Sequence, residues 1–161
     1  MSRFDNEVRV SLSVLDRLID YEPEVSREAP ASRTKSLRLL KQAVRRDLEW
    51  LFNTRQTPAL PAGLSEALRS VYAYGLPDFT NLSSRNISDH SRLRRAVEMA
   101  IEAFEPRLED VQVIVEPAVD TVRMLQFRID ARLKLDPVPE PVTFDTSFHI
   151  GSAEFRVKGE A

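Results

Sequence analysis

The chain has 161 residues, of which 42% are hydrophobic and 30% are charged, and its formal net charge is −2 at pH 7. This length and composition fit one soluble domain with its own hydrophobic core, and the near balance of charge points to neither a nucleic acid nor an anionic membrane surface. Because the chain has no cysteine, disulfides and thiol catalysis are excluded, which is compatible with a reducing compartment.

The first residues predict neither a signal peptide nor a membrane span. Asp5, Glu7 and Asp16 interrupt the place where a signal peptide would need an apolar core. No stretch of the chain approaches the roughly 20 apolar residues of a membrane-spanning helix. We therefore expect a cytoplasmic protein without membrane insertion.

A short amphipathic segment comes first in the chain. Apolar residues between positions 12 and 19, among them Leu15 and Leu18, recur at helical spacing and predict a small helix or docking peptide. The polar stretch after it, up to residue 35, has neither helical nor strand periodicity and is interpreted as a linker. We expect residues 1–35 to be a mobile peptide and linker, and residues 36–161 to form a single domain.

Two helices are predicted in the middle of the chain. Residues 37–53 carry apolar side chains at helical spacing, with charged residues on the other faces. A shorter helix is expected over residues 64–74, because Leu64, Leu68 and Val71 would share a face and Gly75 follows where a C-terminal cap belongs.

A further helix precedes the region of strands. Ser88 or Ser91 can accept hydrogen bonds from its first amides, and Pro106 ends it. Its expected buried stripe consists of Leu93, Val97, Ala100, Ile101 and Phe104.

After Pro106 the hydrophobic period changes from 3.6 to 2, which indicates strands. Alternation begins around Val113, is strict over residues 125–135, and returns over residues 142–148 and 153–157. Helices followed by an antiparallel sheet make an α+β fold, with N-terminal helices packed on a C-terminal sheet of three to four strands.

The residue inventory offers little catalytic chemistry. His90 and His149 are the only histidines, so a metal set or a catalytic triad has few donors, and both are better explained by capping, packing or surface roles. The four glycines are never adjacent, which argues against a phosphate-binding loop. We expect no cofactor, no metal and no catalytic residue.

One enzyme class stays open, because glycoside hydrolysis needs only two suitably placed carboxylates. Glu102, Glu105, Glu109 and Asp110 cluster at the end of a predicted helix, although such a run is more often a solvated face. Arginine runs such as residues 92–95 lack neighbouring aromatic residues for base stacking, so no nucleic acid is expected.

Four stretches of the chain stand out as motifs. The most specific is Ala100–Leu108, which contains the signature Glu105-Pro106-Arg107. The others are residues 13–18, residues 44–49 continuing into 53–55, and residues 74–79. Together, and in this order along the chain, they resemble the TssE family of type VI secretion baseplate subunits and the wider T4-type baseplate wedge family.

The resemblance implies a structural part of a cytoplasmic baseplate. Its expected partners are the wedge proteins TssF and TssG, with TssK as a further candidate, and the sheath proteins TssB and TssC. The family is also labelled lysozyme-like, so a peptidoglycan-cleaving hydrolase is the alternative function. The expected partner-binding residues are Glu105, Pro106, Arg107, Leu15, Leu18, Asp78 and Phe79.

Two physical expectations accompany the resemblance. Arg107 follows the proline that ends a helix, where its guanidinium can satisfy free carbonyls or clamp a carboxylate with two hydrogen bonds. This corner can therefore be an internal cap, a docking point for the wedge, or both. An exposed edge of the sheet could accept a strand from the first sheath ring.

Overall fold

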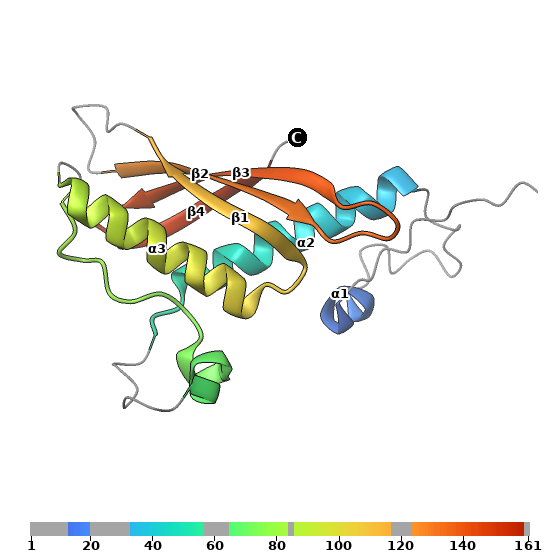
Figure 1. Cartoon of the computed structure of the whole chain (residues 1–161), viewed down its shortest axis with the longest axis horizontal. Coiled ribbons are helices and arrows are strands. Elements are labelled where there is room, and N and C mark those ends of the chain that lie inside the picture. The colour runs from blue at the N-terminus through green and yellow to red at the C-terminus, as the bar shows by residue number, and fades with distance from the viewer. Residues whose placement is uncertain (1–12, 20–32, 57–64, 84–85, 117–123, 160–161) are drawn as a thin grey trace, which may run out of the picture.

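The structure, a computed structural model, describes residues 13–19, 33–56, 65–83, 86–116 and 124–159 (Figure 1). The helices are α1 (Val14–Leu18), α2 (Arg33–Asn53) and α3 (Ile87–Phe104), with two 3-10 helices, η1 (Ser65–Arg69) and η2 (Val71–Ala73), between α2 and α3. The strands are β1 (Leu108–Val115), β2 (Met124–Leu133), β3 (Glu140–His149) and β4 (Glu154–Gly159).

The four strands form one antiparallel sheet in the order β1-β2-β3-β4. Both long helices lie on the same side of this sheet (Figure 1), with α3 packed against β1 and α2 against β4. The expected α+β architecture is therefore confirmed, with four strands. The opposite face of the sheet carries exposed polar side chains, for example Gln126 and Arg128.

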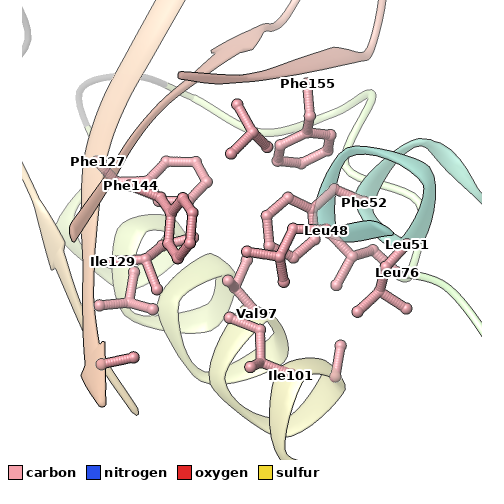
Figure 2. Packing of buried hydrophobic residues seen from close by; sticks show 14 of the residues in the cluster. Leu48, Leu51, Phe52, Leu76, Val97, Ile101, Phe127, Ile129, Phe144 and Phe155 are labelled. Carbon is pink, nitrogen blue, oxygen red and sulfur yellow. The ribbon is translucent and has the colours of Figure 1, made fainter. Parts of the chain in front are cut away.

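The strict alternation along β2 explains why it is the centre of the core. Its inward residues Leu125, Phe127 and Ile129 are almost completely buried, while the side chains between them face solvent. Phe155 of β4 joins this layer to α2, because its ring centroid lies 6.2 Å from that of Phe127 on β2 and 5.8 Å from that of Phe52 on α2 (Figure 2). Its ring also stacks on Phe148 of β3, with centroids 4.4 Å apart. Helices and sheet thus share one core.

Three local expectations need correction. Helix α2 begins at Arg33, so residues 33–35 are helical rather than part of the linker; residues 20–32 lie outside the described residues. The helix expected over residues 64–74 is two short 3-10 helices, and Val71 is 91% exposed rather than buried. Asn86, not Ser88 or Ser91, caps α3, because its side-chain oxygen accepts a hydrogen bond from the Ser88 amide at 3.0 Å.

Two motifs far apart in sequence meet at a glycine that backbone geometry requires. The Leu76 amide donates to the Thr54 carbonyl at 2.9 Å, and the Gln56 amide donates to the Leu76 carbonyl at 2.9 Å. Gly75 between these contacts has a φ of +113°, and a Cβ built on it would lie 2.3 Å from the Thr54 oxygen. Only glycine fits here. Gly75 was expected to cap an α-helix over residues 64–74, but the element before it is the 3-10 helix η2, whose C-cap is Tyr74.

Helix side chains cover parts of both free edges of the sheet. Asn53, the last residue of α2, donates to the Phe155 carbonyl at 2.9 Å and accepts from the Phe155 amide at 2.8 Å, as a neighbouring strand would. Arg45 donates to the Val157 carbonyl at 3.2 Å on the same edge. At the other edge, the Val113 amide donates to the Glu98 carboxylate on α3 at 3.1 Å. These contacts occupy backbone groups of the edge strands that could otherwise pair with a strand of another chain.

Candidate functional site

The Glu-Pro-Arg sequence forms a tight corner between α3 and β1. Glu105 ends α3, and its amide still donates to the Ile101 carbonyl at 2.8 Å. Its carboxylate turns back onto Arg107, whose Nε and Nη2 donate to the two Glu105 oxygens at 2.7 and 2.6 Å. The expected bidentate clamp on a carboxylate is thus internal to the chain. Lys134, just after β2, fixes the corner by donating to the carbonyls of Pro106 and Arg107.

Helix α2 adds two charged residues to this corner. The second oxygen of Asp47 lies 2.5 Å from Nη2 of Arg107. The first oxygen of Asp47 accepts from Nε and Nη2 of Arg46 at 3.0 and 2.8 Å. The sequence alone suggested that Arg46 lies on a wet helix face, but its side chain is only 20% exposed.

Helix α1 completes the arrangement through Asp16. One Asp16 oxygen accepts from Arg46 at 2.7 Å, and the other lies 3.6 Å from Nη1 of Arg107. Asp16 also forms a capping box with Ser13, whose hydroxyl accepts from the Asp16 amide at 3.1 Å. We call Asp16, Arg46, Asp47, Glu105 and Arg107 the ion cluster; its three carboxylates and two guanidinium groups join α1, α2 and the α3–β1 corner.

Charge pairing in the ion cluster outweighs the cost of burial. Burial opposes the ionised form of Asp16, but hydrogen bonds from Ser13 and Arg46 and the charge of Arg46 lower its pKa from 3.8. Burial likewise opposes the charged form of Arg107, yet hydrogen bonds and charge from Glu105 and Asp47 raise its pKa above the ordinary value. The pKa of Arg46 is also raised, because Asp16 and Asp47 overcome its burial.

A pocket of about 450 Å³ opens beside the ion cluster. Tyr74 and Phe104 line it, with ring centroids 5.2 Å apart in an edge-to-face arrangement. Burial, followed by the negative charges of Asp47 and Glu105, raises the pKa of Tyr74 above 10.0, so its hydroxyl is protonated at neutral pH. Both aromatic side chains and charged side chains of the ion cluster therefore line the pocket.

The residues expected to bind partners divide into exposed and buried ones. Leu15 and Leu18 on α1 are 44% and 76% exposed, and Pro106 is exposed as well. Glu105, in contrast, is only 4% exposed, and its carboxylate is fully engaged with Arg107. The structure therefore brings Leu15, Leu18 and the corner together through Asp16, with the apolar side chains directed outward.

Asp78 and Phe79 belong to a different part of the molecule. Asp78 is exposed, and its carboxylate accepts from the Thr80 amide at 3.0 Å and pairs loosely with Arg55 at 3.7 Å. Its pKa is lowered, mainly by hydrogen bonds from Thr80. Phe79 is buried, with the Arg92 guanidinium 5.9 Å from its ring centroid. Both residues shape the loop after Gly75 rather than the ion cluster.

Three members of the ion cluster were not expected as site residues: Asp16, Arg46 and Asp47. Arg46 and Asp47 stand in a matched motif, and Asp16 stands at the third position of a helix that begins after a serine cap. These local signals predict helices. They do not indicate that Asp16 and Arg46, which are 30 residues apart in the sequence, lie next to each other in the fold.

The described residues offer limited catalytic chemistry at this corner. A general acid needs a proton to give, whereas the Glu105 carboxylate is held as a salt bridge to Arg107. Within the described ranges, no group of three or more His, Cys, Asp or Glu side chains is arranged to hold a metal ion. No helix among these residues is long and apolar enough to cross a membrane. The arrangement is suited to fixing α1 on the body of the protein.

Comparison with known proteins gives one match. The model of the family described as baseplate wedge protein gp25 matches residues 38–138, which is more than half of the chain. This span includes α2, the Glu-Pro-Arg corner and β2. No curated protein and no solved structure matches the chain.

Proposed function

The chain belongs to the gp25 baseplate wedge family, and from this premise we propose that it is a TssE-type structural subunit of a type VI secretion baseplate. Family membership gives the coarser role, that of a structural part of a baseplate that contacts other baseplate components. The secretion system and the individual partners are our proposal. It is supported by the motifs at residues 53–55 and 74–79, which meet at Gly75.

One observation carries the proposal for partner binding. Helix α1 is held by its charged residue while its apolar side chains point to solvent: Val14 and Leu18 are 72% and 76% exposed, and Asp16 has only 7% of its side chain exposed. A helix of five residues with an apolar outer face has little stability alone. Exposed leucines on a fixed helix are the kind of anchor that a partner helix can cover.

We assign the wedge contact to the surface formed by Leu15, Leu18 and Pro106. The proposed partners on this surface are TssF and TssG, with TssK as a further candidate. Glu105 is too buried to meet a partner directly, so its proposed role, shared with Arg107, is to hold α1 and the corner in place. In this assignment the segment before α2 acts as the docking peptide, and the chain from α2 onward forms the baseplate domain. We propose that it works in the cytoplasm as a structural part and not as an enzyme.

The sheath contact is proposed for a free edge of the sheet, where a strand from TssB or TssC would pair and help to start sheath assembly. Asn53 and Arg45 already occupy part of the β4 edge, and Glu98 occupies part of the β1 edge. A strand added beside Phe155 must therefore displace the Asn53 side chain. Substituting Asn53 by alanine is expected to leave this edge open to pairing, while deleting residues 142–157 is expected to abolish sheath assembly on the baseplate.

A combined assay tests the proposed function against the hydrolase alternative. Tagged wild type, Leu18→Glu and Val138→Glu are each expressed with TssF and TssG, and the same proteins are incubated with peptidoglycan. We expect wild type and Val138→Glu to co-purify with the wedge proteins, Leu18→Glu to lose them, and no preparation to release glycan. Glycan cleavage that Glu105→Gln abolishes would defeat the structural assignment.

A further inference from the structure

A second pocket lies away from the ion cluster, between the N-terminal half of α2 and the sheet. It encloses about 570 Å³. We call it the α2 groove. Leu37 and Lys41 line one wall, and Val142, Phe144 and Val157 of β3 and β4 line the other. These three residues are apolar and buried members of the core, and Thr143, Lys158 and Gly159 also line this wall.

The groove lies beside Gly159, the last residue of β4. The inward row of β4 consists of Phe155, Val157 and then Gly159, which has no side chain to fill the space. A Cβ built on Gly159 would meet only the Arg45 side chain, at an ordinary contact distance of 3.5 Å. The space beside Gly159 can therefore accept an apolar side chain from outside without a change in the backbone.

The charge of the groove is one-sided. Arg38, Lys41 and Arg45 of α2 and Lys158 of β4 line it, and no carboxylate is among the described residues of its lining. Lys41 pairs with Glu140 at 3.2 Å, and Arg45 is 3.5 Å from Glu49. Among the described residues Arg38 is exposed and has no acidic partner, so its charge is available to a ligand.

We propose that the α2 groove binds an acidic, apolar peptide segment of a partner protein. An apolar side chain of that segment occupies the space beside Gly159, against Val142 and Val157. A neighbouring aspartate or glutamate pairs with Arg38 at the open rim. The charge complementarity of four lining cations and the apolar residues of the sheet wall selects this chemistry over a basic or purely polar segment. The groove adjoins the β4 edge proposed above for the sheath contact, since Arg45 and Val157 belong to both, but its occupant inserts a side chain beside Gly159 instead of pairing as a strand beside Phe155.

The test begins with the full-length protein and a library of random 12-residue peptides displayed on phage. We expect the selected peptides to share a large apolar residue next to Asp or Glu. The strongest peptide, labelled with fluorescein, is then titrated by fluorescence anisotropy against wild type and variants. Gly159→Leu fills the space and should weaken binding by at least about tenfold, which corresponds to about 1.4 kcal/mol. Arg38→Glu should weaken it by about fivefold or more and reduce its salt dependence.

Arg156→Glu is the matched control for Arg38→Glu, because it also replaces an arginine by a glutamate. Arg156 lies on β4, on the face of the sheet opposite the groove, where it pairs with Glu154 at 3.4 Å. Binding by this variant should stay within about twofold of wild type, a difference well below 1 kcal/mol. Thermal melting of Gly159→Leu at the wild-type temperature would establish that the variant folds, and Arg38→Glu tests the site independently on an exposed position.

Three results would overturn the proposal. The first is a selection without acidic, apolar peptides, or peptide binding that neither Gly159→Leu nor Arg38→Glu weakens. The second is a dimer in sedimentation experiments that Gly159→Leu dissociates, since the occupant would then be a second copy of the chain. The third is binding of a synthetic peptide with the sequence of residues 20–32, which contains four acidic residues and one arginine, since the occupant would then be the chain's own segment.

Discussion

Asp16 on α1 and Arg46 on α2 form the contact that ties the N-terminal helix to the rest of the protein. The Asp16 carboxylate accepts from Nη2 of Arg46 at 2.7 Å, and both side chains are largely buried. The Arg46 guanidinium also lies 5.0 Å from the ring centroid of Trp50, the only tryptophan in the chain. Trp50, which is 52% exposed, therefore reports on the state of this contact.

Asp16→Asn should release α1. The amide removes the charge that pairs with Arg46 and Arg107, and α1 has too few residues to stay in place alone. The free energy of unfolding should fall by only about 1 kcal/mol or less, because the released arginines reach water. Trp50 fluorescence should change in native buffer. Asp145→Asn, at a 71% exposed position, is the control and should leave the spectrum as in wild type; an identical spectrum for Asp16→Asn would contradict this role of Asp16.

The docking of α1 should also depend on acid. Pairing lowers the pKa of Asp16 from 3.8 in the docked state. A carboxylate with a lowered pKa contributes stability that is complete above its ordinary pKa and is lost as the pH falls through the lower value. Trp50 fluorescence should therefore show a transition below pH 3.8 that Asp16→Asn lacks. A midpoint above that value, or the same transition in the variant, would speak against Asp16 as the titrating group.

Arg107→Ala should destabilise the whole domain rather than α1 alone. It leaves the Glu105 carboxylate, which is 5% exposed, without the guanidinium that satisfies both of its oxygens. Removing one partner of a buried pair typically costs about 3 kcal/mol or more. Urea denaturation should show this loss, whereas Arg132→Ala, which breaks an exposed pair with Asp110, should cost below about 1 kcal/mol. Equal losses for the two variants would refute the structural role of the corner.

Gly75→Ala should be among the most damaging small substitutions in the chain. The new methyl group would clash with the Thr54 carbonyl, and the φ of +113° disfavours any side chain. We expect a loss of about 3 kcal/mol or more in the free energy of unfolding. Gly151→Ala is the matched control, because a Cβ there meets nothing within 4 Å and should change stability by about 0.5 kcal/mol or less. Calorimetry on both variants checks the difference.

Much of the fold follows from hydrophobic periodicity. The alternation from Leu125 onward predicted β2, the apolar stripe around Leu93 and Val97 predicted α3, and both are confirmed. The wrong predictions concern the residue that caps α3 and the type of helix before Gly75, where the sequence allows alternatives of similar stability. Asn86 and Ser88 are both good caps. Residues 65–73 form two 3-10 helices, in which Val71 is 91% exposed, so this residue does not contribute to the buried helix face that the spacing predicted.

The candidate site was predicted only in part. Proline after a helix and arginine beside it made the Glu105–Arg107 clamp foreseeable from chemistry alone. The contribution of Asp16 and Asp47 depends on how α1 and α2 pack against the corner, and no spacing in the sequence encodes that distance. For the same reason the α2 groove has no sequence signal, since it depends on how α2 packs beside β3 and β4.

The most direct test of the central claim is the affinity of the purified protein for the purified TssF–TssG complex. In interferometry, Leu18→Glu should weaken binding by at least about tenfold, because a charge replaces a 76% exposed leucine at the proposed anchor. Val138→Glu, at a 67% exposed position between β2 and β3, should bind as wild type does. Wild-type affinity for Leu18→Glu, or no binding by the wild type itself, would contradict the assignment of this surface to the baseplate wedge.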